Sequence, residues 1–360
     1  MNAARLGNYI WYHRDLRPEM EITHEGSMAL YNQLLKDPPL GPTAPVKRLR
    51  SNAYNENGKH VVAIVRSDDR TNGIREAISL LGGLAPIVEG VQGEFLIKPN
   101  CNTDNPYPID SHPGTVRAIV ESLMGAGVQP DKIVLGETSG RARGLPTRQT
   151  MENLGMLAVA EDLGIGVCFF EEEEEWVTVK PPGTPSWPEG IKIPKRVYDA
   201  ERVILTPIMR PHSTATFTIS LKLVVGMLDS VGREWLHDGH AHHAKVVDLN
   251  LAYSADLIIA DASKILVSNK RNSRRAAEPG IIIASGNRVA SDAASVALMR
   301  LNGADKVIER AVWEHEQFKI AKIRDLGPHG LEGISLRILD LEGDPGFEDT
   351  VSGIRDELES

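Results

Sequence analysis

Polar and ionisable side chains follow directly after several short apolar runs of this chain. The stretch EFLIKPNCN (94–102) is the clearest example, because Phe95, Leu96 and Ile97 give way at once to Lys98, Pro99 and Asn100. The residues in the same position after other runs are Glu137 with Ser139, Arg210 with His212, Asp261, and Ser285 with Asn287 and Asp292. Lysine and arginine bind carboxylate and phosphate oxygens, whereas imidazole and carboxylate groups transfer protons. The residue types therefore indicate a small-anion site with acid–base groups.

Lys98 is the hardest of these residues to explain by a purely structural role. Turns and helix caps account equally well for Asn100, Ser285 and Asn287, because amides and hydroxyls are common there. An ammonium group beside a buried strand is costly unless it has a partner. We therefore expect Lys98 to point into a cleft and to meet a carboxylate or a bound anion.

Histidines supply two further candidate sites, each with a second interpretation. His112 stands where SHPG begins a predicted helix, and it fits either a local cap or an acid–base group. The segment HDGHAHHAK contributes His237, His240 and His242, which together could bind a divalent metal such as zinc, nickel or ferrous iron. Its spacing fits no closed metal-binding template, and a solvated loop explains the same residues.

The segment SNKRNSRRAAEPG (268–280) is strongly basic in an otherwise acidic protein. It contains Lys270, Arg271, Arg274 and Arg275. A local positive patch attracts a small anion or an acidic partner protein, and a solvated surface loop is the alternative.

The elements that must position these residues are apolar runs alternating with amphipathic segments. Ile74, Ala77, Ile78 and Leu81, for example, have the spacing of one helix face, and the segment ends at a glycine pair. Uniformly apolar strands separated by such helices predict an α/β fold, with a mostly parallel sheet covered on both faces. Ligands of such folds bind outside the carboxyl ends of the strands, which is where the polar residues stand.

The order of patterns along the chain predicts five parts. They are an N-terminal extension (1–58), a first α/β half (59–170), a β-hairpin excursion (171–200), a second α/β half (201–340) and an acidic tail that looks frayed (341–360).

Composition excludes several classes of protein. A formal charge of −9 disfavours a nucleic-acid binder, because phosphate contacts need a basic surface. Two cysteines, Cys101 and Cys168, are too few to hold an iron–sulphur cluster or a disulfide framework, so we expect a reducing cytoplasm. Neither a secretory signal nor a membrane-spanning apolar run is recognisable, so we expect a soluble protein.

Several segments in a fixed order resemble one known family. They are FLIKPNCN, SHPGTVRAIVESLMGAG leading to KIVLGE, IPKRVYDAERVILTPIMRPHS, LKLVVGMLD, VVDLNLAYSADLIIADA and IIIASGNRVASDAASVALMRLNG. Over roughly residues 60–335 the chain is similar to the family called domain of unknown function 362. The resemblance implies an α/β protein often accompanied by ferredoxin-type iron–sulphur modules. The polar positions that it implies are Lys98, Asn100, His112, Glu137, His212, Lys222, Asp248, Asn250, Asp261 and Asp292.

The chain also departs from the family's pattern. Arg210 replaces a lysine that usually precedes the central histidine, and arginine can clamp an anion but cannot titrate. The basic segment 268–280 replaces a glycine-rich loop. Ferredoxin-like cysteines are missing, so any cluster would have to belong to a partner protein.

Two hypotheses of function follow. In the first, an enzyme binds a small anionic substrate, with or without a divalent metal. Its acid–base or orienting groups would be His112, His212 and Glu137, and its substrate contacts Lys98, Asn100, Ser139, Arg210, Lys222, Asp261 and Asp292. In the second, the same cleft and the basic segment dock an acidic or iron–sulphur protein without chemistry. A symmetric homodimer is the default expectation for the oligomeric state.

Overall fold

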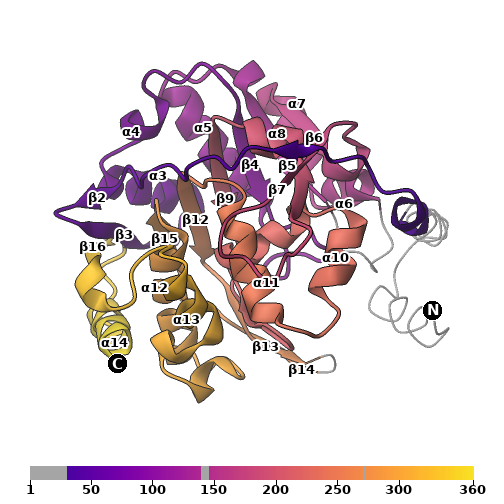
Figure 1. Cartoon of the computed structure of the whole chain (residues 1–360). Coiled ribbons are helices and arrows are strands. Elements are labelled where there is room, and N and C mark those ends of the chain that lie inside the picture. The colour runs from indigo at the N-terminus through magenta and orange to yellow at the C-terminus, as the bar shows by residue number, and fades with distance from the viewer. Residues whose placement is uncertain (1–30, 139–145, 271–272) are drawn as a thin grey trace.

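A computed structural model describes residues 31–138, 146–270 and 273–360 of the chain. Within these residues a large sheet has the strand order β16-β3-β15-β12-β9-β4-β5-β6, with β2 paired to β3 (Figure 1). The strand bounds are β2 (Asn55–Glu56), β3 (Lys59–Arg66), β4 (Phe95–Pro99), β5 (Ile133–Glu137), β6 (Gly166–Phe169), β9 (Arg202–Thr206), β12 (Leu257–Ala262), β15 (Ile281–Ser285) and β16 (Ile334–Asp340). The main strands run parallel except β15, which is antiparallel to both β3 and β12.

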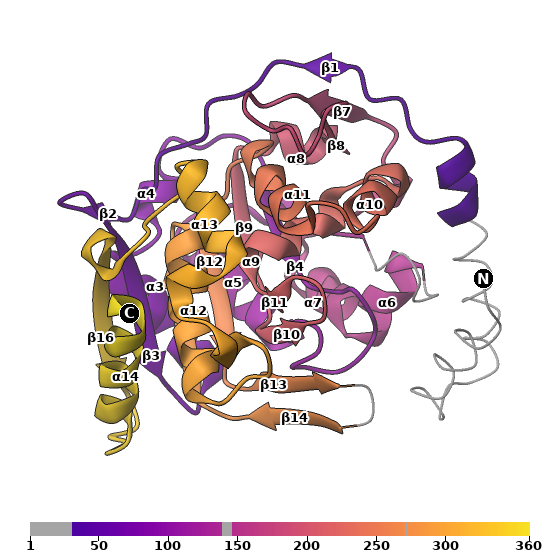
Figure 2. The ribbon, with the colours of Figure 1, turned by 60° about the horizontal axis from the view of Figure 1, so that its bottom comes forward.

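Helices cover both faces of this sheet, as Figures 1 and 2 show. The bounds of the helices on the first face are α3 (Arg70–Leu81), α5 (Pro113–Gly125) and α7 (Met156–Leu163). Those on the second face are α9 (Ser220–Leu223), α11 (His242–Asp248), α12 (Arg288–Leu301) and α13 (Glu316–Ile323). Side chains of β4 alternate between the two faces, with Phe95 and Ile97 in one hydrophobic cluster and Leu96 in another. The predicted α/β fold with a mostly parallel sheet is confirmed.

The remaining elements are short and lie around this frame. Their bounds are α4 (Ala85–Val88), α6 (Thr147–Asn153), α8 (Lys195–Asp199) and α10 (Ser230–Leu236), with strands β1 (Thr43–Ala44), β7 (Trp176–Val179), β8 (Ile191–Pro194), β10 (Arg210–His212), β11 (Thr216–Thr218), β13 (Ile265–Lys270) and β14 (Ser273–Ala277). The predicted hairpin excursion is present as β7 and β8, which pair antiparallel, and β1 adds to it from the N-terminal segment. No helix in the described ranges combines the length and the apolar character needed to cross a bilayer.

Two predictions about local structure were wrong. The acidic tail is not frayed, because helix α14 (Phe347–Glu359) buries Phe347, Ile354 and Leu358 against the core on one face. That face has helical spacing, which the acidic composition hid. The basic segment is not a plain loop, since β13 and β14 form an antiparallel hairpin that projects from the body (Figure 2).

Candidate functional site

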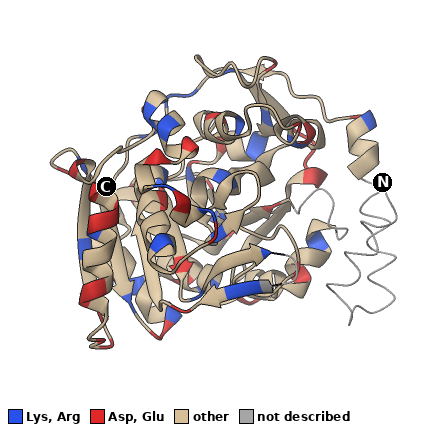
Figure 3. Cartoon of the chain, turned by 90° about the horizontal axis from the view of Figure 1, so that it is seen from below, with Lys and Arg blue, Asp and Glu red and all other residues tan. Residues whose placement is uncertain are grey.

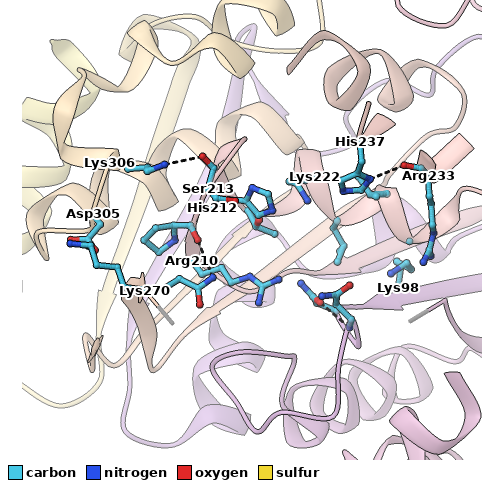
Figure 4. Close-up of a pocket in the computed structure, with 18 of the residues that line it drawn as sticks. Lys98, Arg210, His212, Ser213, Lys222, Arg233, His237, Lys270, Asp305 and Lys306 are labelled. Atoms are coloured by element: carbon cyan, nitrogen blue, oxygen red, sulfur yellow. Dashed lines mark hydrogen bonds and ion pairs between the residues drawn. The ribbon is translucent and has the colours of Figure 1, made fainter. Parts of the chain in front are cut away.

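A cleft with a volume of about 780 Å³ opens at the carboxyl ends of β4 and β5 (Figure 4). Its walls come from the β10–β11 hairpin, α9, α10, the β13–β14 hairpin and the turn after α12. The lysines and arginines that line it among the described residues are Lys98, Arg210, Lys222, Arg233, Lys270 and Lys306, and the acidic residues are Glu137, Asp305 and Glu309. The lining is therefore positive on balance, although the protein as a whole is acidic. Figure 3 shows where basic and acidic residues lie along the ribbon.

The floor of the cleft is an ion pair between Lys98 and Glu137. Lys98 Nζ lies 2.5 Å from Glu137 Oε1, and both side chains are buried. Glu137 also accepts hydrogen bonds from the backbone N–H groups of Cys101 and Thr138, each at 2.8 Å. Burial lowers the pKa of Lys98, and Glu137 opposes that shift. Lys98 thus lies next to the last residue of β4, and Glu137 at the end of the neighbouring strand β5 supplies the carboxylate that a buried lysine needs.

Gly226 lets the turn after α9 close over this pair. A Cβ atom at this position would lie 2.5 Å from Glu137 Oε1 and 2.8 Å from Lys98 Nζ, which is closer than real contacts allow. The backbone here therefore requires glycine for its close approach rather than for its dihedral angles.

Lys222 lies half-buried in the wall opposite the ion pair, on α9. Asp292 fixes the first turn of this helix, because its carboxylate accepts from Ser220 N at 3.0 Å and from Leu221 N at 2.9 Å. The side-chain amide of Asn250 donates to Leu221 O of the same helix at 2.9 Å. Among the described residues, no hydrogen-bond acceptor or carboxylate pairs with the Lys222 amine. The helix is thus anchored while the amine is left open to the cleft.

Cations surround Lys222. Burial comes first and the charges of Arg210 and Arg233 come next in lowering the pKa of Lys222 to about 7. Arg233 is buried on α10 and donates to Thr138 O at 3.0 Å, whereas Arg210 reaches Ile109 O at 3.4 Å. The amine is therefore partly neutral near pH 7.

His212 presents one defined ring nitrogen to the cleft. Its Nδ1 accepts from the backbone N–H groups of Thr214 at 3.2 Å and Ala215 at 3.0 Å. An accepting Nδ1 places the proton of the neutral ring on Nε2. Burial, together with the charges of Lys222 and Arg210, holds the pKa of His212 far below its usual range. His212 is consequently a neutral hydrogen-bond donor at neutral pH. The acid–base role that the sequence suggested for it is thereby limited to donating a hydrogen bond from Nε2.

The mouth of the cleft holds charges that pair with each other. Asp305 lies 3.6 Å from the Lys270 amine and 3.5 Å from an Arg275 guanidinium nitrogen, and its carboxylate also accepts from Ser268. Lys306 donates to Ser213 O at 2.8 Å, so two lysines of the mouth already have acceptors (Figure 4).

Some predicted site residues lie elsewhere. Asp261 is buried against Arg70, Tyr107 and Thr115, with distances of 2.7, 3.0 and 2.6 Å to its carboxylate, and it does not line the cleft. His112 caps α5 by accepting from Gly114 N at 2.9 Å.

Asp292 is also absent from the lining, for a reason of topology. The sequence grouped Asp292 with the residues at the strand ends that form the cleft. However, β15 is antiparallel to its neighbours, so Ser285 at its end lies near the amino ends of the parallel strands, where it pairs with Val62. Asp292 therefore supports the cleft from behind α9 and does not face it.

Asn100 does line the cleft, and its side-chain oxygen accepts from Asn102 N at 3.2 Å. Ser139 lies outside the described residues.

The three histidines proposed as metal ligands are spread over the end of α10 and the start of α11. His237 lines the cleft, His240 is exposed, and His242 is buried with its Nδ1 at 3.0 Å from Leu236 O. In the ranges that the structure describes, no three His, Cys, Asp or Glu residues are grouped so that they could hold a metal ion.

Several residues that line the cleft, among them Arg233, Thr138 and Thr218, were not among the predicted site residues. Arg233 belongs to a helix that returns to the sheet from a distant segment, and nothing near it in the sequence reveals that path. The hydroxyl oxygens of Thr138 and Thr218 are buried without a hydrogen-bond partner in the described structure. Thr138 directly follows Glu137 after an apolar run, so its position did carry a signal.

Comparisons with known proteins add a family match and two similar proteins. Residues 95–297 match the family described as "Domain of unknown function (DUF362)". Thylakoid-associated protein sll1697 from Synechocystis sp. is 26% identical over 247 residues, which cover 64% of this chain and 73% of that protein. The lactate racemase apoprotein from Thermoanaerobacterium thermosaccharolyticum aligns with 89% of this chain and 90% of its own, at 11% identity and a TM-score of 0.35. A structural likeness at that score carries no argument about activity.

Proposed function

Because the chain belongs to the domain of unknown function (DUF362) family, whose name assigns no activity, we propose a function from the chemistry of the cleft. The cleft binds a small molecule that carries a carboxylate or phosphate group, and the protein acts on it as an enzyme. Arg210, Arg233 and Lys222 contact the ligand, and Lys98 adds positive charge from the floor, partly offset by Glu137.

The observation that carries this proposal is the state of Lys222. A half-buried ammonium between two arginines raises the energy of the empty site, and Lys222 has no acceptor among the described residues to offset it. An anion in the cleft would supply that acceptor. Two of the three acidic side chains in the described lining are already paired, Glu137 with Lys98 and Asp305 with Lys270.

Catalysis is favoured over simple binding because donors of several kinds face one space. Neutral His212 offers Nε2–H, and the guanidinium group of Arg210 and the amine of Lys222 border the same cleft. Donors fixed in advance stabilise charge that develops on a reacting oxygen. Glu137 serves in this proposal as the partner that fixes Lys98 and not as a proton carrier.

The test is a thermal-shift titration with acetate, oxalate, pyruvate and inorganic phosphate. At least one of these anions should raise the melting temperature of the wild-type protein. Lys222→Met should weaken its binding about tenfold or more, because a charge-assisted hydrogen bond contributes about 1.5–3 kcal/mol. Lys264→Met is a suitable control, since that partly exposed lysine pairs with Glu278 outside the cleft. If no anion stabilises the wild type, or if both variants respond like it, the proposal fails.

A metal-assisted version of the reaction is a separate prediction. Elemental analysis of purified protein would test it. The histidines His237, His240 and His242 support it less than their closeness in sequence suggested, for the geometric reason given above.

The second candidate function is docking of an acidic or iron–sulphur protein at the β13–β14 hairpin. The observation in its favour is that Lys270 and Arg275 stand exposed on this projecting hairpin. Asp305 partly neutralises both, which weakens the attraction. Neutralising Arg271, Arg274 and Arg275 should abolish partner capture at low salt if docking is the function, and should leave small-anion binding nearly unchanged.

A reducing compartment, the cytoplasm, is the location that we infer. Both cysteines are buried as free thiols. Cell fractionation, with a separate membrane-surface fraction, would test this location.

A further inference from the structure

We propose that Lys222 is the nucleophile of this cleft and forms an imine with a carbonyl compound that also carries an anionic group, such as a 2-oxo carboxylate. The inference rests on the proposed function, because Arg210 and Arg233 would hold the anionic group while the amine meets the carbonyl carbon. The class of substrate thereby narrows from small anions in general to carbonyl acids.

The first argument is a comparison among the four lysines that line the cleft. Lys98 pairs with Glu137 at 2.5 Å, Lys270 lies 3.6 Å from Asp305, and Lys306 donates to a backbone carbonyl at 2.8 Å. Lys222 alone of the four has no acceptor in the described part of the chain. An amine whose task is to hold charge usually has a partner that favours the charged form, whereas a nucleophilic amine must be able to lose its proton.

The second argument is the surroundings of the amine. The groups that face Lys222 are Arg210 and His212 from β10, Arg233 from α10, and the imidazole of His242 from α11. None of these is an acid. Two permanent positive charges and partial burial favour the uncharged amine, and its pKa of about 7 leaves a large neutral fraction at neutral pH.

The third argument is the hydrogen-bond donor that His212 supplies in the same cleft as Lys222. His212 keeps its Nε2 proton because Nδ1 accepts from Thr214 and Ala215. A neutral imidazole N–H polarises a carbonyl group without giving up its proton. His212 and Lys222 both border the same space in Figure 4, so one carbonyl could meet the donor at oxygen and the amine at carbon.

The reaction balances without a further reagent. The lone pair of the Lys222 amine forms a bond to the carbonyl carbon, and the carbonyl π electrons move to oxygen. One amine proton passes to that oxygen through solvent, giving a carbinolamine. The hydroxyl group then leaves with the second amine proton as water, and a carbon–nitrogen double bond remains. One amine and one carbonyl compound thus yield one imine and one water, with no change in oxidation state.

Reductive trapping tests this inference. Wild-type protein is incubated near neutral pH with pyruvate or glyoxylate and sodium cyanoborohydride, and the modified lysine is mapped by peptide mass spectrometry. Lys222 should be labelled at least about tenfold faster than any other lysine, because its lower pKa leaves more free amine. The labelling rate should be half-maximal near pH 7. Lys264→Met should be labelled like the wild type, and acetate or phosphate should slow the labelling by competition.

The outcomes separate this inference from the proposed function. If acetate or phosphate stabilises the protein but Lys222 is labelled no faster than surface lysines, the imine is refuted and anion binding stands. If neither anion binding nor labelling is seen, both fall. If Lys222→Met is poorly folded, the wild-type map and its pH profile decide by themselves, since they need no variant.

Discussion

Two lysines line the same cleft from opposite sides, and in the described residues only Lys98 has an acidic partner. Lys98 stands on the floor, fully buried, with the Glu137 carboxylate at 2.5 Å. Lys222 stands in the wall among cations, and no acceptor in the described residues pairs with it. The protein therefore neutralises one amine internally and leaves the other for a ligand or a reaction. Residue type does not separate these roles, but the presence of a fixed acidic partner does.

The largest expected effect tests the paired side. Glu137→Gln keeps the size of the side chain but removes the charge opposite Lys98, and an unpaired buried charge typically costs about 3–5 kcal/mol. Urea unfolding should show a loss of that order. The double variant Lys98→Met/Glu137→Gln should recover most of it. A loss below about 1 kcal/mol in the single variant would mean that the pair is not a structural unit.

The next largest effect is expected at Asp292, which anchors the helix α9 that carries Lys222. Asp292→Ala leaves the N–H groups of Ser220 and Leu221 without their carboxylate, which should cost about 1–3 kcal/mol of stability. Anion affinity should fall as well, because α9 carries Lys222. Ser295→Ala on the same helix, α12, is the control, and it should change affinity little. Unchanged affinity in Asp292→Ala would show that Lys222 does not need this anchor.

The pH dependence of stability should contain a contribution from Lys222. The folded-state pKa of Lys222 is about 7, below its unfolded value of 10.5, so the contribution of Lys222 is fully present above about pH 10.5 and is lost as the pH falls towards 7. Unfolding free energy should therefore rise between pH 7 and pH 10 by an amount on the order of 1 kcal/mol, after allowance for solvent screening. Lys222→Met should remove this rise. A rise of equal size in Lys222→Met would assign it to other groups.

The smallest effect is expected at the mouth. Arg275→Gln breaks an exposed contact with Asp305 and should change stability by less than about 1 kcal/mol. It should slow anion association at low salt and have no effect at high salt, because screening removes long-range attraction. Stopped-flow binding at two ionic strengths would measure this. A large loss of affinity at high salt would instead place Arg275 in direct contact with the ligand.

The sequence predicted the side of the cleft with the Lys98–Glu137 pair better than the side with Lys222. Lys98 and Glu137 follow apolar runs of two adjacent parallel strands, so the rule that polar groups gather at carboxyl edges applied to them directly. The apolar run before Ser285 looks the same, yet its strand β15 is antiparallel, so Ser285 lies at the opposite end of the strands from Lys98 and Glu137. A strand buried on both faces has no periodic pattern that reveals its direction.

The open side depends on contacts between distant segments. Family resemblance pointed to Lys222, but neither it nor local pattern indicated that Arg233 would lie nearby or that Asp292 would anchor α9. These relations arise only when α10 and α12 pack on the sheet. The wrong prediction for the C-terminal helix has a different cause. Phe347, Ile354 and Leu358 do lie at helical spacing, but the prediction rested on the acidic composition of the segment instead of on that spacing.

The pairing of β3 has a consequence for how the molecule is assembled. Its neighbours in the sheet, β15 and β16, both come from the last quarter of the chain. During synthesis β3 must wait unpaired along most of its length until those strands leave the ribosome, and pairing across so long a loop is slow. A fragment ending before residue 281 would therefore expose an apolar strand edge and should aggregate where the whole chain folds.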